Sequence, residues 1–328
     1  MSEPLIDILM ATYNGVRFVG EQIESIQAQT YGNWRLLVSD DCSIDGTLDI
    51  VRRYAAEDER IRIVSEGVRR GGAKENFFAL MRQTNAAYVM FCDQDDLWRE
   101  DKVEVELSAI LDSERRYGPS CPIMAHSNLA LMDRDGCALN VTMREIITDA
   151  DIKTASPEQV LLTSVATGCT MALNRQCIDE CLKVGHLDDV VMHDWWATLT
   201  ACLLGVRVYI DESLVFYRQH ENNVTGALGK QAPIQAKIIN YAAVGIENGL
   251  MAIGQNTAQG ELGHIRQAQN FYRTYRGQVK AELLEPLADV CGLPESSFSH
   301  RLAILTRYHL WRKGFKRNLR LLLAMANL

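Results

Sequence analysis

The sequence predicts an α/β protein with a mixed, mostly parallel sheet flanked by helices, followed by a helical C-terminal region. Three features lead to this class. Over about the first 120 residues, short apolar runs alternate with segments whose apolar residues recur at helical spacing. Between about 120 and 220, strand-like runs continue with shorter helices. From about residue 231 the pattern becomes helical, with few strand signals. Such alternation is typical of parallel sheets with helices on both faces.

Each element follows from its local pattern. The short apolar runs expected as strands are 5–12, 35–39, 61–64, 87–92, 123–132 and 206–218. The segments expected as helices carry apolar residues on one face, as Val19, Ile23 and Ile26 do in the first; they are 16–29, 46–56, 73–85, 102–116 and 194–204. A turn at 133–136 ends the fifth strand, and 165–173 is a small apolar run.

These elements predict two regions. Residues 1–228 are expected to form the α/β domain, with halves at about 1–96 and 97–228. Residues 229–328 are expected to form the helical region. The pattern leaves open whether the helical region is separate or packs on the first domain.

Composition excludes several classes of protein. The 47% hydrophobic and 23% charged residues are ordinary for a soluble globular chain. The net charge of −8 argues against a nucleic-acid partner, because phosphate contacts need Lys and Arg. Nine cysteines without a Cys-x-x-Cys pair fit reduced thiols better than a zinc site. No signal-peptide pattern and no apolar run of ~18 residues occurs, so we expect a cytoplasmic protein.

Polar motifs follow four of the expected strands, where ligands of such sheets bind. They are Ala-Thr-Tyr-Asn-Gly at 11–15, Asp-Asp-Cys-Ser-Ile-Asp-Gly-Thr at 40–47, a basic loop at 69–74 and Asp-Gln-Asp-Asp at 93–96. No Gly-x-Gly-x-x-Gly follows the first strand and no P-loop occurs, so a dinucleotide fold and a P-loop NTPase are disfavoured.

The Asp93-Gln94-Asp95-Asp96 motif places three carboxylates within four residues. Carboxylates this close repel one another, and the repulsion raises their pKa values. Mg²⁺ and Mn²⁺ bind carboxylate oxygens together with substrate phosphates. The alternative is a solvated acidic turn that caps a helix over 97–113. A second acidic pair, Asp40-Asp41, is expected at a neighbouring strand end, so the divalent-cation site is favoured.

Four motifs in this order resemble the inverting family 2 glycosyltransferases with the Rossmann-like GT-A fold. They are Ala11-Thr12-Tyr13-Asn14, the 40–47 motif, Asp93-Gln94-Asp95-Asp96 and His193-Asp194-Trp195-Trp196. The resemblance covers roughly residues 4–220. It implies that the half at 1–96 holds a nucleotide sugar and the half at 97–228 holds the acceptor. It also implies that Mg²⁺ or Mn²⁺ neutralises the donor diphosphate.

The resemblance assigns residues to the donor and the metal. The donor-binding set is Thr12, Tyr13, Asn14, Asp41, Lys74, Asp93 and Asp95. Asp41 would accept a hydrogen bond from N3–H of uracil or thymine. Asp95 would ligate the metal, while Asp93 would reach the ribose or metal-bound waters. His220 would approach the metal or the diphosphate, unless it is a structural histidine. Lys74, or Arg69 and Arg70, would add positive charge, unless they form an exposed basic loop.

The same resemblance assigns the acceptor side. Asp194, at the start of a predicted helix, would be the general base that takes the acceptor hydroxyl proton. The alternative is an acid that interacts with the helix dipole. Asp96, Gly168 and Trp195 would lie on the acceptor side. Trp195 either stacks on a sugar or belongs to the core, and Gly168 either lines the site or packs tightly in a strand.

The motifs around 193–196 and 217–226 look like the rhamnosyltransferase branch, which uses dTDP-L-rhamnose to build cell-surface polysaccharide or lipopolysaccharide. The alternative is a UDP-sugar-dependent transferase (Gal, GlcNAc or Glc) of the same fold. The processive pattern Gln-x-x-Arg-Trp is absent, which favours addition of one sugar. A non-catalytic nucleotide-sugar or glycan-binding scaffold is the alternative from another class. A nucleotidyltransferase and a dehalogenase-like phosphatase are disfavoured, because their motifs would follow the first strand.

The C-terminal segment differs in charge from the rest. Residues 296–328 contain seven Lys or Arg and no acid, which leaves 27 basic and 42 acidic residues, a net charge of −15, elsewhere. Apolar residues interleave with the bases, so an amphipathic helix within 301–323 is expected either to contact the inner face of a membrane peripherally or to pack on the protein. The oligomeric state is left open.

Overall fold

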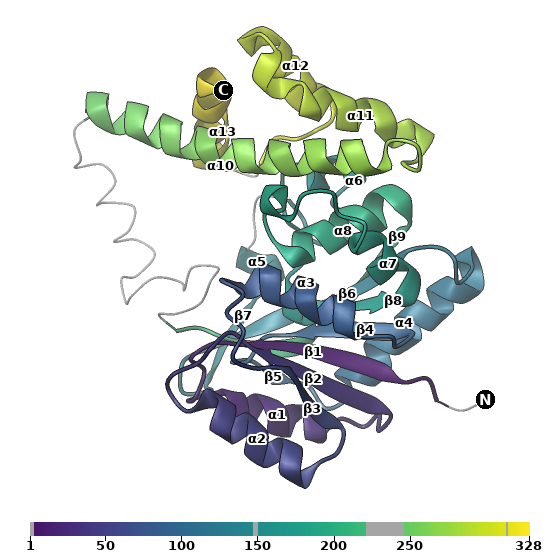
Figure 1. The fold of residues 1–328 in the computed structure, drawn as a ribbon. Coiled ribbons are helices and arrows are strands. Elements are labelled where there is room, and N and C mark those ends of the chain that lie inside the picture. The colour runs from purple at the N-terminus through teal and green to yellow at the C-terminus, as the bar shows by residue number, and fades with distance from the viewer. Residues whose placement is uncertain (1–2, 147–149, 221–245, 313) are drawn as a thin grey trace.

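A mixed sheet lies at the centre of the computed structural model, which describes residues 3–146, 150–220, 246–312 and 314–328 (Figure 1). Within these residues its strand order is β3-β2-β1-β4-β8-β6-β9-β5, with β7 paired to β6 beside this path. The strands are β1 Ile6–Thr12, β2 Trp34–Asp40, β3 Ile61–Ser65, β4 Tyr88–Cys92, β5 Leu97–Trp98, β6 Ile123–Met132, β7 Ala138–Thr142, β8 Met171–Asn174 and β9 Val206–Arg218.

The predicted fold class is confirmed. β3, β2, β1 and β4 run parallel to one another, and β6 runs parallel to β9. β8 joins the two groups by antiparallel pairing with β4 and β6. The six expected strands begin and end within one residue of the prediction. The pattern did not reveal β5 and β7, which are short and pair with longer strands. The run 165–173 is only partly a strand, because a 3-10 turn, η1 Gly168–Thr170, precedes β8.

Helices cover both faces of the sheet. They are α1 Val19–Gln27, α2 Thr47–Glu57, α3 Ala73–Gln83, α4 Lys102–Tyr117, α5 Met143–Ile146, α6 Pro157–Val160, α7 Arg175–Cys181 and α8 His193–Leu204. Helix α1 starts three residues later than predicted. The reason is tertiary: the backbone N–H groups of Gly15 and Val16 bond to side chains of Thr47 and Asp45 in the neighbouring loop.

Alternating residues of the buried strands divide the core into two layers. Leu9 of β1 and Phe91 of β4 pack with α3 and α8, whereas Ile8, Met10 and Met90 pack with α1, α2 and α4. This alternation is the direct result of the two-residue side-chain period of a strand. The register matters for function, because Thr12 pairs with Asp40 and Met10 with Cys92. The carboxyl ends of β1, β2 and β4 therefore meet at one edge.

The helical C-terminal region packs on α7 and α8 and shares their apolar core. It comprises α10 Ile246–Tyr275, α11 Ala281–Cys291, the short turn η3 Leu293–Glu295, α12 Phe298–Arg307 and α13 Phe315–Asn327. Phe271 of α10 contacts Trp196 of α8 at 5.3 Å between ring centroids. Tyr275 donates its hydroxyl to the carbonyl of Glu180. The expected boundary at 228/229 and the polar motif at 222–226 lie outside the described residues.

Among the described helices, none combines the length and apolar character needed to cross a bilayer.

Candidate active site

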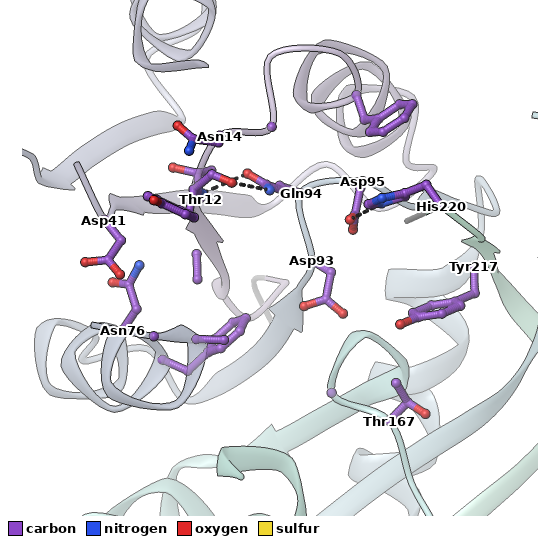
Figure 2. A pocket seen from close by; sticks show the side chains of 18 of the residues that line it. Thr12, Asn14, Asp41, Asn76, Asp93, Gln94, Asp95, Thr167, Tyr217 and His220 are labelled. Carbon is purple, nitrogen blue, oxygen red and sulfur yellow. Dashed lines mark hydrogen bonds and ion pairs between the residues drawn. The ribbon is translucent and has the colours of Figure 1, made fainter. Parts of the chain in front are cut away.

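A cavity of about 650 Å³ opens at the carboxyl ends of β1 and β4 (Figure 2). This volume lies within the range of roughly 300–1,000 Å³ that is usual for small-molecule and cofactor pockets. Nine residues expected from the sequence line it: Thr12, Tyr13, Asn14, Asp41, Asp93, Asp95, Gly168, Asp194 and His220. The fold therefore brings together side chains from six separate segments of the chain.

Two adjacent aspartates at the end of β2 have different surroundings. Asp40 accepts hydrogen bonds from Thr12 Oγ1 at 2.8 Å and from the Ser43 hydroxyl at 2.6 Å, so it holds the turn together. Asp41 accepts bonds from the backbone N–H groups of Arg70 and Gly71, and it also lines the cavity. Of the two aspartates, only Asp41 lines the cavity, and its role in contacting a base stays a prediction.

The loop after β1 is held rigidly against the 42–47 loop. Asn14 has a left-handed backbone conformation, with φ 47°, and its N–H donates to Ser43 Oγ at 2.9 Å. Its side-chain carbonyl accepts the N–H of Ile44 at 3.0 Å. Gln94 forms two further bonds with the backbone of Tyr13, at 3.0 and 2.9 Å. Asn14 therefore organises the wall of the cavity, and its side chain is used within the protein.

Asp95 and His220 meet at the opposite end of the cavity, where their side chains point toward each other (Figure 2). His220 Nε2 lies 2.7 Å from Asp95 Oδ2. The imidazole also packs on the ring of Phe18, at 5.0 Å between centroids. The two residues predicted to serve a metal are therefore in direct contact, although 125 residues separate them in sequence.

Arg218, the last residue of β9, connects the acidic loop to its surroundings. It is almost fully buried, with 1% of its surface exposed. Its Nε donates to the carbonyl of Asp95 at 2.8 Å, and its backbone N–H donates to Asp96 at 3.1 Å. Its other guanidinium nitrogens donate to the carbonyl of Arg134 at 3.0 Å and to Glu21 at 2.6 Å. Arg218 therefore sets the position of the loop that carries Asp95.

Changing Arg218→Lys should weaken binding of a nucleoside diphosphate with Mn²⁺ about tenfold, because one ammonium group cannot replace a fork of donors. Calorimetric titration measures this change. Arg35→Lys is the control: Arg35 donates two hydrogen bonds to the buried carboxylate of Asp7, at 2.8 and 2.7 Å, and neither residue lines the cavity. Both variants should lose thermal stability, but only Arg218→Lys should lose affinity. Equal affinities in the two variants would show that Arg218 serves stability alone.

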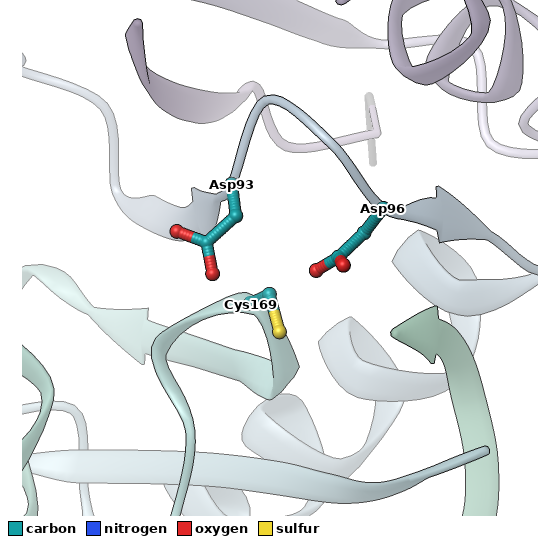
Figure 3. Close-up of side chains that lie close together, drawn as sticks. All are labelled: Asp93, Asp96 and Cys169. Atoms are coloured by element: carbon teal, nitrogen blue, oxygen red, sulfur yellow. The ribbon is translucent and has the colours of Figure 1, made fainter. Parts of the chain in front are cut away.

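Asp93, Asp96 and Cys169 form a cluster beneath this loop, with one ligand-type atom of each within 4.8 Å of the others (Figure 3). Burial, followed by the charges of Asp95 and Asp194, raises the pKa of Asp93 to about 7. Burial and the neighbouring carboxylates also raise the pKa of Asp96. Carboxylates that repel one another in a buried turn fit a divalent cation, which would favour their charged forms.

Asp194 faces the cavity from the first turn of α8. Its carboxylate accepts the N–H of Gly168 at 3.0 Å and the N–H of Trp195 at 2.6 Å. Burial raises its pKa to about 6, although these backbone hydrogen bonds partly oppose the shift. A carboxylate of this pKa is ionised at neutral pH and is a stronger base than an exposed aspartate.

His193 lies beside Asp194 and also lines the cavity. Its ring stacks on Phe77 at 3.9 Å between centroids, and burial lowers its pKa to about 3. The imidazole is therefore neutral near pH 7 and adds no positive charge next to Asp194. A Cβ atom on Gly168 would lie 2.9 Å from His193 Nε2, so only glycine fits here without displacing the ring.

Three expected site residues lie away from the cavity. Lys74 points elsewhere, because its ammonium group donates to the carbonyls of Leu187 and Val190 at 3.1 and 3.0 Å. Asp96 is fully buried under the loop and accepts from Arg218, so it cannot contact an acceptor. Trp195 is buried in the core, and its indole N–H donates to the carbonyl of Val160 at 2.7 Å. Stacking of Trp195 on a sugar is therefore wrong for this structure.

Several residues of the cavity wall were not expected from the sequence. They include Arg17, Phe18, Asn76, Phe77, Arg134 and Met192, whereas Gln94 and Tyr217 belong to the quoted motifs but had no assigned role. Arg69 and Arg70, the alternatives to Lys74, are not part of the wall. Asn76 is fully buried, and its side-chain amide donates to the carbonyl of Ser39 at 2.9 Å. Asn76 lies in the first turn of α3, at the edge where β2 ends, and this position is the feature of the sequence that could have predicted its place in the cavity wall.

A sequence profile of glycosyl transferase family 2 matches residues 7–119. This part carries β1 to α4 and the loop Asp93-Gln94-Asp95-Asp96, which we call the Asp-x-Asp loop. This part of the chain belongs to glycosyl transferase family 2. The match confirms the resemblance predicted from the ordered motifs, and with it the prediction that the protein is a glycosyltransferase.

Relatives and solved structures support the same assignment. The chain is 29% identical over 230 residues to the dTDP-rhamnosyl transferase RfbG of Shigella flexneri, a match covering 66% of this chain and 74% of that protein. Other curated relatives are matched over about half of their length or less. S. aureus TarS 1–349 in complex with UDP-GlcNAc is similar with TM-score 0.52 and 13% identity, over 98% of this chain and 91% of that one.

A second solved structure extends the likeness in fold to the whole chain. The mannosyltransferase PcManGT from Pyrobaculum calidifontis, in complex with GDP-Man and Mn²⁺, is similar with TM-score 0.51 and 17% identity, over 100% of this chain and 87% of that one. These likenesses identify the fold of the glycosyltransferase as GT-A.

Proposed function

We propose that this glycosyltransferase moves one sugar, with inversion, from dTDP-L-rhamnose to a hydroxyl of a cell-surface polysaccharide or lipopolysaccharide precursor. The observation that carries the proposal is the carboxylate of Asp194, which lines the same cavity as Asp93 and Asp95. Inverting transfer needs a base on the acceptor side and a site for the leaving diphosphate, and the cavity offers candidates for both.

The proposed reaction is a single displacement. The acceptor oxygen attacks the anomeric carbon and forms the new glycosidic bond. The bond between that carbon and the diphosphate oxygen breaks, and the nucleoside diphosphate leaves with the electron pair. The acceptor proton passes to Asp194, which is ionised above its pKa of about 6. Attack opposite the leaving group inverts the anomeric configuration.

The donor set around the Asp-x-Asp loop is suited to Mg²⁺ or Mn²⁺. Asp95 and Asp93 would hold the cation, with His220 bonded to Asp95. When bound, the cation supplies positive charge to the diphosphate leaving group. In the PcManGT structure, the related fold is seen with a nucleotide sugar and Mn²⁺.

Rhamnose is proposed as the sugar because a relative that is matched over 74% of its length is a dTDP-rhamnosyl transferase. Asp41 cannot choose between thymine and uracil by itself, since both bases present the same N3–H. Discrimination must come from the 5-methyl group or the 2′ position of the ribose.

The test is calorimetric titration of dTDP and UDP with Mn²⁺, Mg²⁺ or EDTA, followed by detection of product from dTDP-L-rhamnose. Metal-dependent binding with dTDP at least tenfold tighter than UDP is the expected result. Tighter binding of UDP would move the assignment to a UDP-sugar donor. Binding of nucleotide without turnover of any nucleotide sugar would support a non-catalytic binding scaffold.

A further inference from the structure

Gln94 lies in the Asp-x-Asp loop, and its side chain bonds to the loop that follows β1. Its amide oxygen accepts the backbone N–H of Tyr13 at 3.0 Å, and its amide nitrogen donates to the backbone carbonyl of Tyr13 at 2.9 Å. Figure 2 shows this side chain extending from its own loop toward Thr12 and Asn14. One amide thus uses both its acceptor and its donor on a single residue 81 positions away. We call these two hydrogen bonds the Gln94 link.

The two loops joined by the Gln94 link carry opposite ends of the cavity. Directly before Tyr13, the carbonyl of Thr12 accepts the backbone N–H of Asp41 at 2.9 Å, so Asp41 is tied to the loop after β1. Directly after Gln94 comes Asp95, which meets His220 at the other end of the cavity. The Gln94 link therefore connects the end that holds Asp41 with the end that holds Asp95.

Gly15 leaves the space that the Gln94 amide occupies. A Cβ atom at position 15 would lie 2.2 Å from Gln94 Oε1 and 2.7 Å from Gln94 Nε2. The backbone of Gly15 is outside the left-handed region, so its own conformation would accept an alanine. The requirement for glycine at this position therefore comes from the amide of Gln94.

We propose that Gln94 is a positioning residue that fixes the nucleoside end of the donor site relative to its cation end. The inference rests on the proposed function, in which Asp41 contacts the base while Asp93 and Asp95 hold the cation. A nucleoside diphosphate bound with its cation uses both ends at once, so its affinity depends on their relative position before binding. A ligand that uses one end does not need the Gln94 link.

The test is calorimetric titration of the full chain and of its Gln94→Ala variant with three probes. The first is dTDP or UDP in EDTA, the second is Mn²⁺ alone, and the third is the same nucleotide with saturating Mn²⁺. Affinities for the first two should stay within about twofold of the wild type, because each uses one end. The affinity for the third should fall about tenfold.

Gln159→Ala is the matched control. The Gln159 amide also bonds through both of its groups, accepting the N–H of Ser156 and donating to the carbonyl of His309, each at 3.0 Å. Gln159 is half-buried as Gln94 is, and it lies outside the cavity wall. A purely structural role of Gln94 would give the two variants the same binding. We expect both to lose thermal stability and only Gln94→Ala to lose affinity.

Gly15→Ala breaks the Gln94 link without changing residue 94. It should weaken binding of the nucleotide with Mn²⁺ about as much as Gln94→Ala does. The double variant should lose no more than one single variant, because the same link is lost in each. Gly32→Ala is the control, since a Cβ atom on Gly32 meets no atom within 4 Å.

The outcomes separate this inference from the proposed function. Wild-type affinity of Gln94→Ala for the nucleotide with Mn²⁺, an equal loss in EDTA, or additive losses in the double variant would overturn the inference while the donor site stands. A wild type that binds neither nucleotide more tightly with Mn²⁺ than in EDTA would overturn the proposed donor site, and this inference with it.

Discussion

The Asp194→Asn variant should lose about 10²- to 10⁴-fold in kcat while its affinity for the nucleotide sugar stays within about twofold of the wild type. Asparagine has nearly the same shape, but it cannot take a proton from the acceptor hydroxyl. Donor affinity should persist, because Asp41 and the Asp-x-Asp loop are unchanged. Steady-state kinetics and calorimetric titration measure the two quantities separately.

The pH profile separates a base from a structural carboxylate. Below its pKa of about 6, Asp194 is protonated and cannot act, so kcat/KM of the wild type should fall about tenfold per pH unit. The residual activity of the Asp194→Asn variant should not show this fall of kcat/KM below pH 6. Because the pKa in the folded state exceeds that of an unfolded aspartate, the ionised side chain costs stability as pH rises from about 4 to 6. Asn should therefore not lower the melting temperature at pH 8.

Asp189→Asn is the control for that variant. Asp189 pairs with Arg273 at 3.0 Å outside the cavity wall, so its loss should leave kcat unchanged. Wild-type turnover by Asp194→Asn would remove Asp194 from the reaction, and the acceptor base would have to be sought elsewhere in the cavity.

Asp95→Ala should abolish the metal-dependent part of nucleotide binding. In the wild type we expect dTDP or UDP to bind at least 100-fold more tightly with Mn²⁺ than with EDTA, because Asp95 would help to hold a cation whose positive charge would stabilise the diphosphate. In the variant the affinities with Mn²⁺ and with EDTA should converge. Titration of each nucleotide under both conditions gives the comparison directly.

Asp135→Ala serves as the control, since Asp135 is an exposed carboxylate that pairs with Arg17 at 2.8 Å. It should retain the full effect of Mn²⁺. Retention of the Mn²⁺ effect by Asp95→Ala would contradict the assignment and point to the cluster of Asp93, Asp96 and Cys169 as the cation site.

Much of the candidate site could be predicted because polar residues after parallel strands gather at one edge. Thr12 ends β1, and Asp41 and Asp93 directly follow β2 and β4; strand register aligns the ends of these three strands. Lys74, Asp96 and Trp195 could not be placed in this way. They lie one or two residues from residues of the cavity wall, but their side chains point into carbonyl groups or the core. Direction of a side chain depends on packing partners that are distant in sequence.

The contacts of Arg218 also could not be predicted from local sequence. Its bonding partners are at positions 21, 95, 96 and 134, and no local pattern connects them. A sequence reader sees only an arginine at the end of a strand. Arg218 can make these hydrogen bonds because β9 pairs with β6 and ends beside the Asp-x-Asp loop.

The sequence by itself determined the alternation of strands and helices, the strand ends that carry polar motifs and the family of residues 7–119, because periodicity and short motifs are local properties of a chain. The tertiary structure alone decided which carboxylates face the cavity and how the helical region joins the α/β core. Those outcomes depend on contacts between residues tens to hundreds of positions apart, where burial and hydrogen-bond partners are set by the whole fold.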